Sequence, residues 1–145
     1  MAYSKYAHAG INTDIQSLQG LSLPIEGVIA SVNSINLANT GTTALYIVPA
    51  NIEIITSKIL IIPETVTGFV TPATSNVGVN AGVGDIIAGD AVADLNAAGL
   101  VSILEPIAAA KIAVATDTIN FNVTVAATAT VFVATVVLVG LLIRN

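Results

Sequence analysis

The sequence predicts an all-β protein, a β-sandwich of jelly-roll-like topology that follows an extended N-terminal arm. Runs of β-branched residues, some of them alternating apolar with polar positions, are typical of strands. Glycine and proline separate these runs at turn and loop distances. The chain of 145 residues is long enough for one domain with a sizeable core. We divide it into an arm, residues 1–40, and a β-sandwich body, residues 41–145.

The clearest strand is predicted over residues 119–125, which read Ile-Asn-Phe-Asn-Val-Thr-Val. Apolar residues at the odd positions alternate with polar residues at the even positions, which is the pattern of a half-buried strand. Residues 44–48 are also rich in side chains that favour strands. Shorter candidate strands are residues 75–80, 100–104 and 109–115.

A long strand is predicted over residues 51–62, between Pro49 and Pro63. Proline lacks the N–H group that a strand ladder needs, so we expect it at the ends of this strand. The consecutive pair Ile54 and Ile55 breaks the alternation. This indicates either a bulge or a strand that is covered on both faces.

One short helix is predicted from Asp90 to Ala98. Asp90 is a suitable N-cap, and Gly99 stands just past the last residue, where helices commonly end. The same segment is also compatible with an irregular loop.

The apolar C-terminal run can be interpreted as a strand or as a membrane-spanning helix. The uncharged residues 123–143 are long enough to cross a bilayer, and Arg144 is suited to an interface. Valine and threonine dominate residues 129–143, however, and both favour strands. The run also follows strand 119–125 across a hairpin-sized gap, and a hairpin partner cannot leave its sheet without orphaning backbone hydrogen bonds. We therefore predict a buried strand and no membrane partner.

As a strand, residues 129–143 present two apolar faces. One face is assigned to the domain's own core, and the other is expected to be covered by a symmetry-related copy. The residues predicted for this oligomer interface are Phe132, Val136, Leu138 and Leu142. A homotrimer is the favoured oligomer, and the alternative is that the arm folds back over this face.

The charge count excludes nucleic-acid binding through a basic patch. Charged residues make up 9% of the chain and hydrophobic residues 54%, whereas about 25% of an ordinary soluble domain is charged. Part of the surface is therefore expected to be covered by partners. The net charge is −5, and the only lysines and arginines are Lys5, Lys58, Lys111 and Arg144. The absence of cysteine excludes disulfide frameworks, zinc ribbons and thiol chemistry.

No catalytic, cofactor-binding or metal-binding residue is predicted, and we expect that the protein is not an enzyme. The single histidine, His8, lies in the arm, and no Gly-x-Ser-x-Gly motif is present. The glycine-rich residues 78–84 fit neither a phosphate loop nor a dinucleotide fingerprint and are interpreted as a turn. Asp85, Asp90 and Asp94 are close enough in sequence to converge on a calcium ion, but their spacing matches no calcium loop. Separate solvated carboxylates are the favoured interpretation.

The arm is interpreted as a docking segment. Residues 1–40 contain glycine and proline but no long periodic run. Ordering such a segment costs about 1–2 kcal/mol per residue, so it requires a surface that receives it. Aromatic and aliphatic side chains carry most interface energy, and the predicted anchors are Tyr3, Tyr6, Ile11, Ile15, Leu18 and Leu21. The alternative is that the arm packs as extra strands on its own domain.

Residues 6–25 read Tyr-Ala-His-Ala-Gly-Ile-Asn-Thr-Asp-Ile-Gln-Ser-Leu-Gln-Gly-Leu-Ser-Leu-Pro-Ile. This segment resembles one that recurs in virion proteins of tailed bacteriophages, often near the N-termini of tail fibres. The pattern there is aromatic-Ala-x-Ala-Gly-x-Asn-x-Asp-Ile-x-Ser-Leu-x-Gly-Leu followed by proline. The matching residues are Tyr6, Gly10, Asn12, Asp14, Ile15, Ser17, Leu18, Gly20 and Leu21.

The body is similar to small β-sandwich phage proteins, which include trimeric capsid decoration, or cement, proteins. The shared order is a valine-rich first hairpin, Val77-Gly78-Val79, Gly84-Asp85, Asp117-Thr118-Ile119 and a closing valine-rich strand.

This resemblance implies a non-enzymatic virion protein on the capsid surface that binds the major capsid protein and needs no cofactor. Such a protein stabilises the shell by binding its assembled state. No long fibre shaft follows before Asn145, so we expect a cement protein rather than a fibre. The alternatives are a short tail-fibre or baseplate adaptor and, in a different class, a membrane protein with a C-terminal span.

Overall fold

The computed structural model describes residues 25–91 and 97–145, which form eight β-strands and no helix. The first four strands are β1 (Ile25–Asn36), β2 (Gly41–Ile47), β3 (Ile52–Thr67) and β4 (Thr74–Gly78). The last four are β5 (Ile87–Ala91), β6 (Ser102–Leu104), β7 (Thr118–Val125) and β8 (Val131–Arg144).

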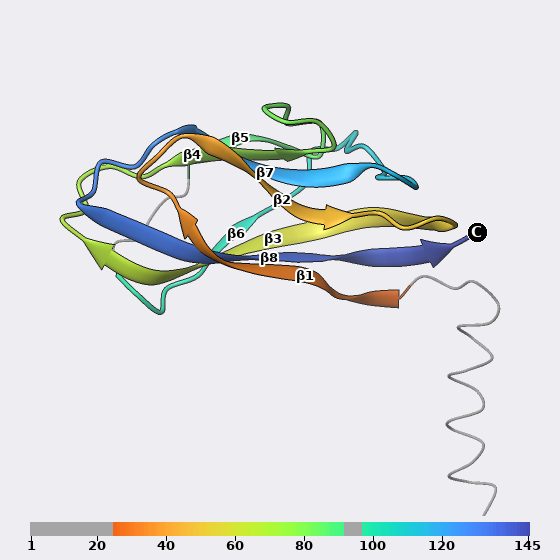
Figure 1. Ribbon diagram of the computed structural model, residues 1–145, viewed down its shortest axis with the longest axis horizontal. Coiled ribbons are helices and arrows are strands. Elements are labelled where there is room, and N and C mark those ends of the chain that lie inside the picture. Colours follow the sequence, from red (N-terminus) through yellow and green to blue (C-terminus); the bar gives the residue numbers. More distant parts are fainter. Residues whose placement is uncertain (1–24, 92–96) are drawn as a thin grey trace, which may run out of the picture.

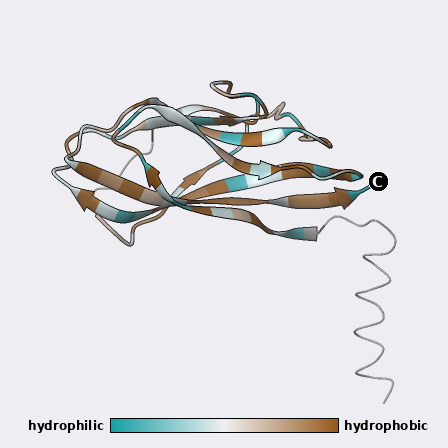
Figure 2. Cartoon of the chain, viewed as in Figure 1, coloured by the Kyte–Doolittle hydropathy of each residue, from teal (hydrophilic) through white to brown (hydrophobic). Residues whose placement is uncertain are grey.

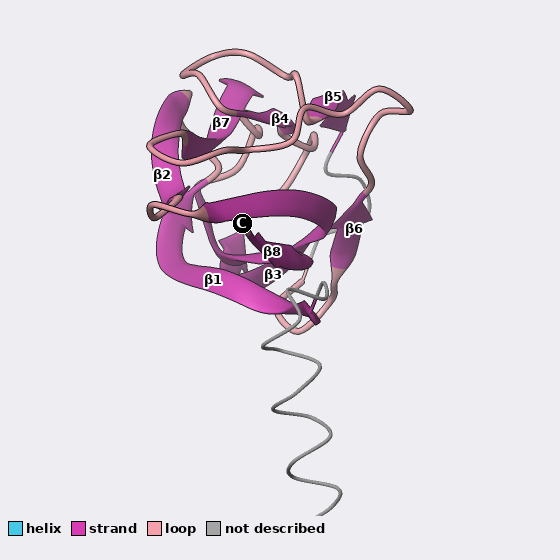
Figure 3. Cartoon of the chain, turned by 90° about the vertical axis from the view of Figure 1, so that its right-hand side faces the viewer, coloured by secondary structure: helices cyan, strands magenta, loops and turns pink. Residues whose placement is uncertain are grey.

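The strands form two four-stranded sheets, in the orders β1-β8-β3-β6 and β2-β7-β4-β5. The sheets lie face to face as two layers (Figures 1 and 3). The antiparallel pairs are nested: β1 with β8, β2 with β7, β3 with β6, and β4 with β5. This is the order of one long hairpin wrapped across two sheets, which is a jelly roll. The predicted all-β sandwich of jelly-roll type is confirmed.

The core fills the space between the sheets, and strand alternation decides which side chains enter it. On β7, Ile119, Phe121 and Val123 point inward, as predicted, and are at most 5% exposed, whereas Val125 at the end of the strand is 57% exposed. On β8, the even-numbered residues Phe132, Val136 and Leu138 point inward and are fully buried. Figure 2 shows hydrophobic colour along most of β8, one of the two inner strands of its sheet.

The predicted oligomer interface lies on the wrong face of β8. Phe132, Val136 and Leu138 belong to the core of their own domain, and Leu142 packs against that core. The face that turns away from the core is the one that the sequence analysis assigned to the interior. Both faces of this strand are apolar, so its residues alone contain no signal that distinguishes inward from outward.

The C-terminal run is a strand, as predicted, but β7 and β8 do not form a hairpin. They lie in different sheets, and β8 pairs with β1 and β3. The connecting residues cross between the layers: Ala127 N–H donates to the Leu37 carbonyl at 2.8 Å and Thr128 N–H to the Thr71 carbonyl at 3.1 Å. A short gap fits a hairpin or a crossing equally well. In the part of the chain that the structure describes, no helix is long and apolar enough to cross a membrane.

The predicted boundary of the arm at residue 40 is also wrong. Residues 25–36 form β1, an edge strand that pairs with β8. The register shifts twice along this pairing, between Val28 and Ala30 and between Val32 and Ile35. Each irregularity breaks the period-two pattern by which a strand is recognised in a sequence.

Pro63 does not end a strand but lies within β3. Its carbonyl accepts a hydrogen bond from Gly99 N–H at 3.3 Å, on the side of β3 that faces β6. Because the N–H and C=O of one strand residue point to the same neighbour, the missing N–H of Pro63 lies on that side too. β6 pairs only with residues 59–61, so proline costs no ladder bond there. The bulge expected near Ile55 is present between Thr56 and Lys58.

The helix predicted from Asp90 does not begin there. Asp90 lies in β5, where Ser75 of β4 is its register partner. Residues 97–99 form a bend and a turn, and Gly99 has a φ of +85°. Of the two capping signals, Asp90 lies in a strand and Gly99 in a turn, and residues 92–96 of the predicted helix lie outside the described residues.

Candidate functional site

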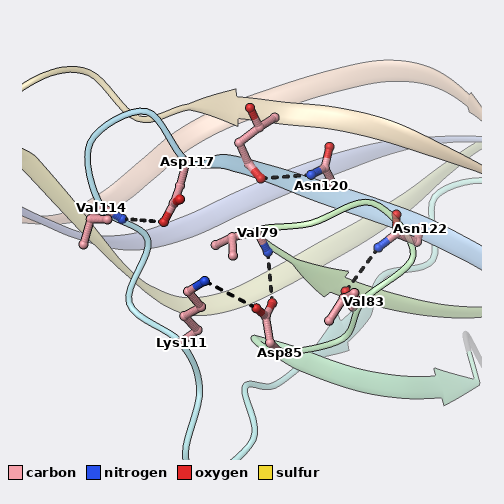
Figure 4. Close-up of polar contacts among 9 residues, drawn as sticks. Val79, Val83, Asp85, Lys111, Val114, Asp117, Asn120 and Asn122 are labelled. Carbon is pink, nitrogen blue, oxygen red and sulfur yellow. Dashed lines mark hydrogen bonds and ion pairs between the residues drawn. The ribbon is translucent and has the colours of Figure 1, made fainter.

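Buried polar side chains gather on the outer face of the β2-β7-β4-β5 sheet. Asn120 and Asn122 of β7 and Asn76 of β4 are at most 8% exposed, and Asn76 is the register partner of Asn122. Asn122 contacts the turn between β4 and β5 through hydrogen bonds, part of which Figure 4 shows. These side chains thus join the turn to the sheet.

The Asn122 amide uses its full hydrogen-bonding capacity. Its Oδ1 accepts from the Thr42 hydroxyl at 2.8 Å and from Gly82 N–H at 2.9 Å. Its Nδ2 donates to Asn76 Oδ1 at 2.6 Å and to the Val83 carbonyl at 3.3 Å. An amide has two donor hydrogens and two acceptor lone pairs, so Asn122 has no group left for a ligand. Its role is to hold the turn.

Asp85 closes the same turn. Its Oδ1 accepts from Val79 N–H at 2.9 Å, and its Oδ2 lies 3.9 Å from Lys111 Nζ (Figure 4). A Cβ atom at Gly78 would collide with the Val83 carbonyl and with the Asp85 carboxylate, so only glycine permits this close approach. The glycine-rich segment is a turn, as interpreted from the sequence.

The three aspartates considered for calcium do not form a site in the described residues. Asp85 binds the turn and pairs with Lys111, Asp90 lies in β5, and Asp94 falls outside the described residues. Over residues 25–91 and 97–145, no three His, Cys, Asp or Glu side chains come close enough to hold a metal ion.

A second polar cluster lies on the outer surface of the β1-β8-β3-β6 sheet, where bulges of β1 and β3 flank β8. Glu64 Oε1 accepts from the Thr135 hydroxyl at 2.7 Å and from Ser34 N–H at 2.9 Å. The Thr135 bond first, and then the Ser34 bond, lower the pKa of Glu64 from its ordinary value. Ser34 has a φ of +61°, a conformation that costs energy for a residue with a Cβ. The Glu64 contacts tie both bulges to the central strand.

Most of the other side chains on that surface are apolar, although Glu26 of β1 and Lys58 of β3 lie there too, opposite Leu141 and Val139. Register places Leu60 of β3 between Ile103 of β6 and Val137 of β8. Val28 of β1 pairs with Val139, and the register continues with Ile55 of β3 opposite Leu141. We call this surface the outer apolar face; its residues are Val28, Ile55, Leu60, Ile103, Val137, Val139 and Leu141. Val28 and Ile103 at its edges are exposed, whereas Val137 and Val139 at its centre are buried in the single chain.

The structure brings together a different set of surface residues from the one predicted. The predicted docking anchors, Tyr3, Tyr6, Ile11, Ile15, Leu18 and Leu21, lie outside the described residues. Sequence reasoning missed the outer apolar face, although the two apolar faces of residues 129–143 were a signal for it. Its residues on β1, β3 and β6 are far apart in the sequence, and only the pairing of these strands brings them together.

Comparisons of the chain with protein families, with curated proteins and with solved structures find no match. The structure therefore defines the class: a jelly-roll β-sandwich that carries the asparagine cluster on one outer sheet face and a largely apolar set of side chains on the other. Its function has to be inferred from those two faces and from the sequence.

Proposed function

We propose that this protein is a non-enzymatic structural component of a tailed-phage virion. It acts as a cement protein that binds the capsid surface as a homo-oligomer. The observation that carries this proposal is the outer apolar face. Val28 and Ile103 are 66% and 55% exposed on it, in a chain of which only 9% is charged. Exposed apolar side chains at the edges of one sheet face, in a chain with so few charges, support a role in contact with partners.

In this proposal, two parts of the chain have different roles. The jelly-roll body supplies contacts between copies, and the N-terminal segment, with the resemblance of residues 6–25 to virion proteins, supplies the contact with the major capsid protein. A protein that binds only the assembled shell stabilises it by mass action, by RT ln(1 + [L]/Kd) for each site. Neither catalysis nor a cofactor is needed for this effect.

A short tail-fibre or baseplate adaptor is the second candidate. The resemblance of residues 6–25 to segments near tail-fibre N-termini favours it. Both candidates are non-enzymatic virion proteins, and they differ in where the protein sits on the particle.

Cryo-electron microscopy of purified virions that contain this protein tests the proposal. We expect density of the jelly roll on the outer capsid surface. Adding the full-length protein to particles that lack it should raise the temperature at which they release DNA. Density on the tail would instead establish the adaptor, and absence of the protein from purified virions would contradict both candidates.

A further inference from the structure

We propose that Asn33 is a site of self-modification, where the backbone nitrogen of Ser34 displaces ammonia from the Asn33 side chain while Glu64 acts as the base. The product is a cyclic imide, a succinimide, which water opens to aspartate or isoaspartate. The Asn33 amide is the substrate and water is the co-reactant. The inference does not depend on the cement function proposed above.

Two bulges bring the reacting groups together. Asn33 and Ser34 of β1 have no register partner on β8, because the register of the two strands shifts at this point. Glu64 of β3 likewise has none, since the β3–β8 register shifts next to Pro63. A bulge leaves its extra residue unpaired and aims its groups in a new direction. The Ser34 N–H consequently donates to a side chain and not to the sheet.

The Ser34 nitrogen is the nucleophile, and the Glu64 carboxylate is its base. Ser34 N–H donates to Glu64 Oε1 at 2.9 Å, a distance at which a general base removes a proton. The attacked amide belongs to the preceding residue, so ring closure is an intramolecular step that gains from proximity. Ser34 is also held at a φ of +61°, and backbone strain of this kind clusters at functional sites.

The Thr135 hydroxyl assists at the carbonyl that is attacked. Its Oγ1 lies 2.7 Å from Glu64 Oε1 and 3.1 Å from Asn33 Oδ1. A hydroxyl has one proton, so Thr135 donates to one of these oxygens at a time. Once Glu64 has accepted the Ser34 proton and lost its charge, the hydroxyl turns to Asn33 Oδ1, where negative charge develops. A donor at this distance stabilises such an oxyanion.

The step balances in atoms and protons. A bond forms between Ser34 N and Asn33 Cγ, the proton of Ser34 N passes to Glu64, and the bond between Asn33 Cγ and Nδ2 breaks. Glu64 gives its proton to the departing nitrogen, which leaves as ammonia. Water then adds to either carbonyl of the ring, and Glu64 ends the reaction as a carboxylate again.

The modification places a second negative charge beside Glu64. Repulsion between the two carboxylates raises the pKa of Glu64. Because Glu64 ties β1 and its own strand to β8 through Ser34 and Thr135, the new charge weakens the attachment of β1. We therefore expect the modified protein to unfold at a lower temperature than the unmodified protein.

Asn80 is the internal reference for the rate. It is exposed, as Asn33 is, and the small residue Ala81 follows it. In the part of the chain that the structure describes, its carbonyl accepts from Val83 N–H at 3.2 Å, and the carboxylate of the turn, Asp85, accepts from Val79 N–H. A difference in rate between Asn33 and Asn80 therefore reports the groups beside Asn33 and not exposure.

Peptide mass spectrometry of the full-length protein, aged at physiological pH and temperature, tests the proposal. The peptide that contains Asn33 should lose the mass of ammonia and then gain that of water, at least about tenfold faster than the Asn80 peptide. Glu64→Gln and Thr135→Val should each slow the conversion of Asn33 about tenfold and leave Asn80 unchanged. Thr135→Ser keeps the hydroxyl and should retain the wild-type rate. Circular dichroism checks that the variants are folded.

Three results would overturn the proposal. Faster conversion of Asn33 in Glu64→Gln would show that the hydrogen bond protects the amide by holding the backbone. Equal rates at Asn33 and Asn80 in the wild type would show that the neighbouring groups have no effect. Recovery of residues 33 and 135 in one cross-linked peptide would show that the Thr135 hydroxyl attacked in place of the Ser34 nitrogen.

Discussion

Asn122 and Asn120 are neighbours on the same face of β7, but Asn122 forms hydrogen bonds with more segments of the chain than Asn120 does. Asn122 binds groups from β2, β4 and the β4–β5 turn. Among the described residues, the Asn120 amide donates only to the carbonyl of Thr118, two residues away on its own strand (Figure 4). Loss of the first side chain removes four hydrogen bonds, one of them to the buried Asn76 amide, whereas loss of the second removes one.

We therefore predict that Asn122→Ala lowers the free energy of unfolding by about 2–3 kcal/mol. Asn120→Ala serves as the control and should cost less than about 1 kcal/mol. Urea denaturation of both variants measures the difference. Equal losses would show that the turn does not depend on Asn122.

Glu64 makes stability depend on pH. Its pKa in the folded chain is lowered, mainly by the Thr135 hydroxyl and then by Ser34 N–H. The carboxylate therefore adds stability that is fully present above its unfolded pKa and is lost as the pH falls through the folded pKa. We expect Glu64→Gln to remove this part of the acid dependence of unfolding.

Titration by NMR tests the cause of the shift. Thr135→Val should move the Glu64 pKa upward towards its ordinary value, because the hydroxyl bond is its largest cause. The control Thr124→Val removes a hydroxyl that bonds to the Thr74 carbonyl on the other sheet and should leave Glu64 unchanged. An unchanged pKa in Thr135→Val would contradict this account.

At the level of elements, β8 is held closely against β3. A Cβ atom added to Gly140 of β8 would lie 2.6 Å from the Ile55 carbonyl oxygen, next to the irregularity between Thr56 and Lys58. Its register partner on β1, Gly27, has open space around the same position. The close approach of β3 therefore requires glycine at Gly140, whereas packing places no such requirement on Gly27.

We predict that Gly140→Ala destabilises the protein by about 2 kcal/mol or more, since backbone has to shift to admit the methyl group. Gly27→Ala should change stability by no more than about 1 kcal/mol. Thermal unfolding of the two variants compares them directly. A tolerated Gly140→Ala would show that β3 and β8 approach less closely than described.

The two faces of β8 give a second test at this scale. Leu138 is fully buried in the sandwich, whereas Leu141, three residues later, belongs to the outer apolar face. Leu138→Asp should prevent folding, because it places an unpaired charge in the core. Leu141→Asp should keep the strand spectrum in circular dichroism. A folded Leu138→Asp variant would contradict the assignment of Leu138 to the core.

For the whole molecule, the body and the N-terminal segment are separable in the proposed function. Strand β1 begins at Ile25, so deletion of residues 2–22 leaves all eight strands in the chain. We expect the truncated protein to fold and to form the same oligomer but to lose binding to particles that lack cement protein. If the truncated protein unfolds, these residues belong to the core and the docking hypothesis fails.

Much of the fold could be predicted because its strands carry local signals. The alternation of residues 119–125 and the valine-rich run of residues 129–143 identified β7 and β8, since period-two patterning requires no knowledge of partners. Strand β1 was not predicted because two register shifts interrupt its alternation. Strand β5 was not predicted because Asp90 resembled a helix cap. These misses arise where the local pattern and the pairing disagree.

The sequence by itself determined that the body is built mainly from β-strands, that residues 129–143 are apolar on both faces and that few charges are available to cover the surface. Only the tertiary structure decided which face of β8 became the core and that β7 and β8 went to opposite sheets. It also gathered Val28, Leu60 and Ile103 onto one surface. The physical reason is that periodicity along a strand records that two faces exist, whereas pairing between distant strands selects the face that is buried.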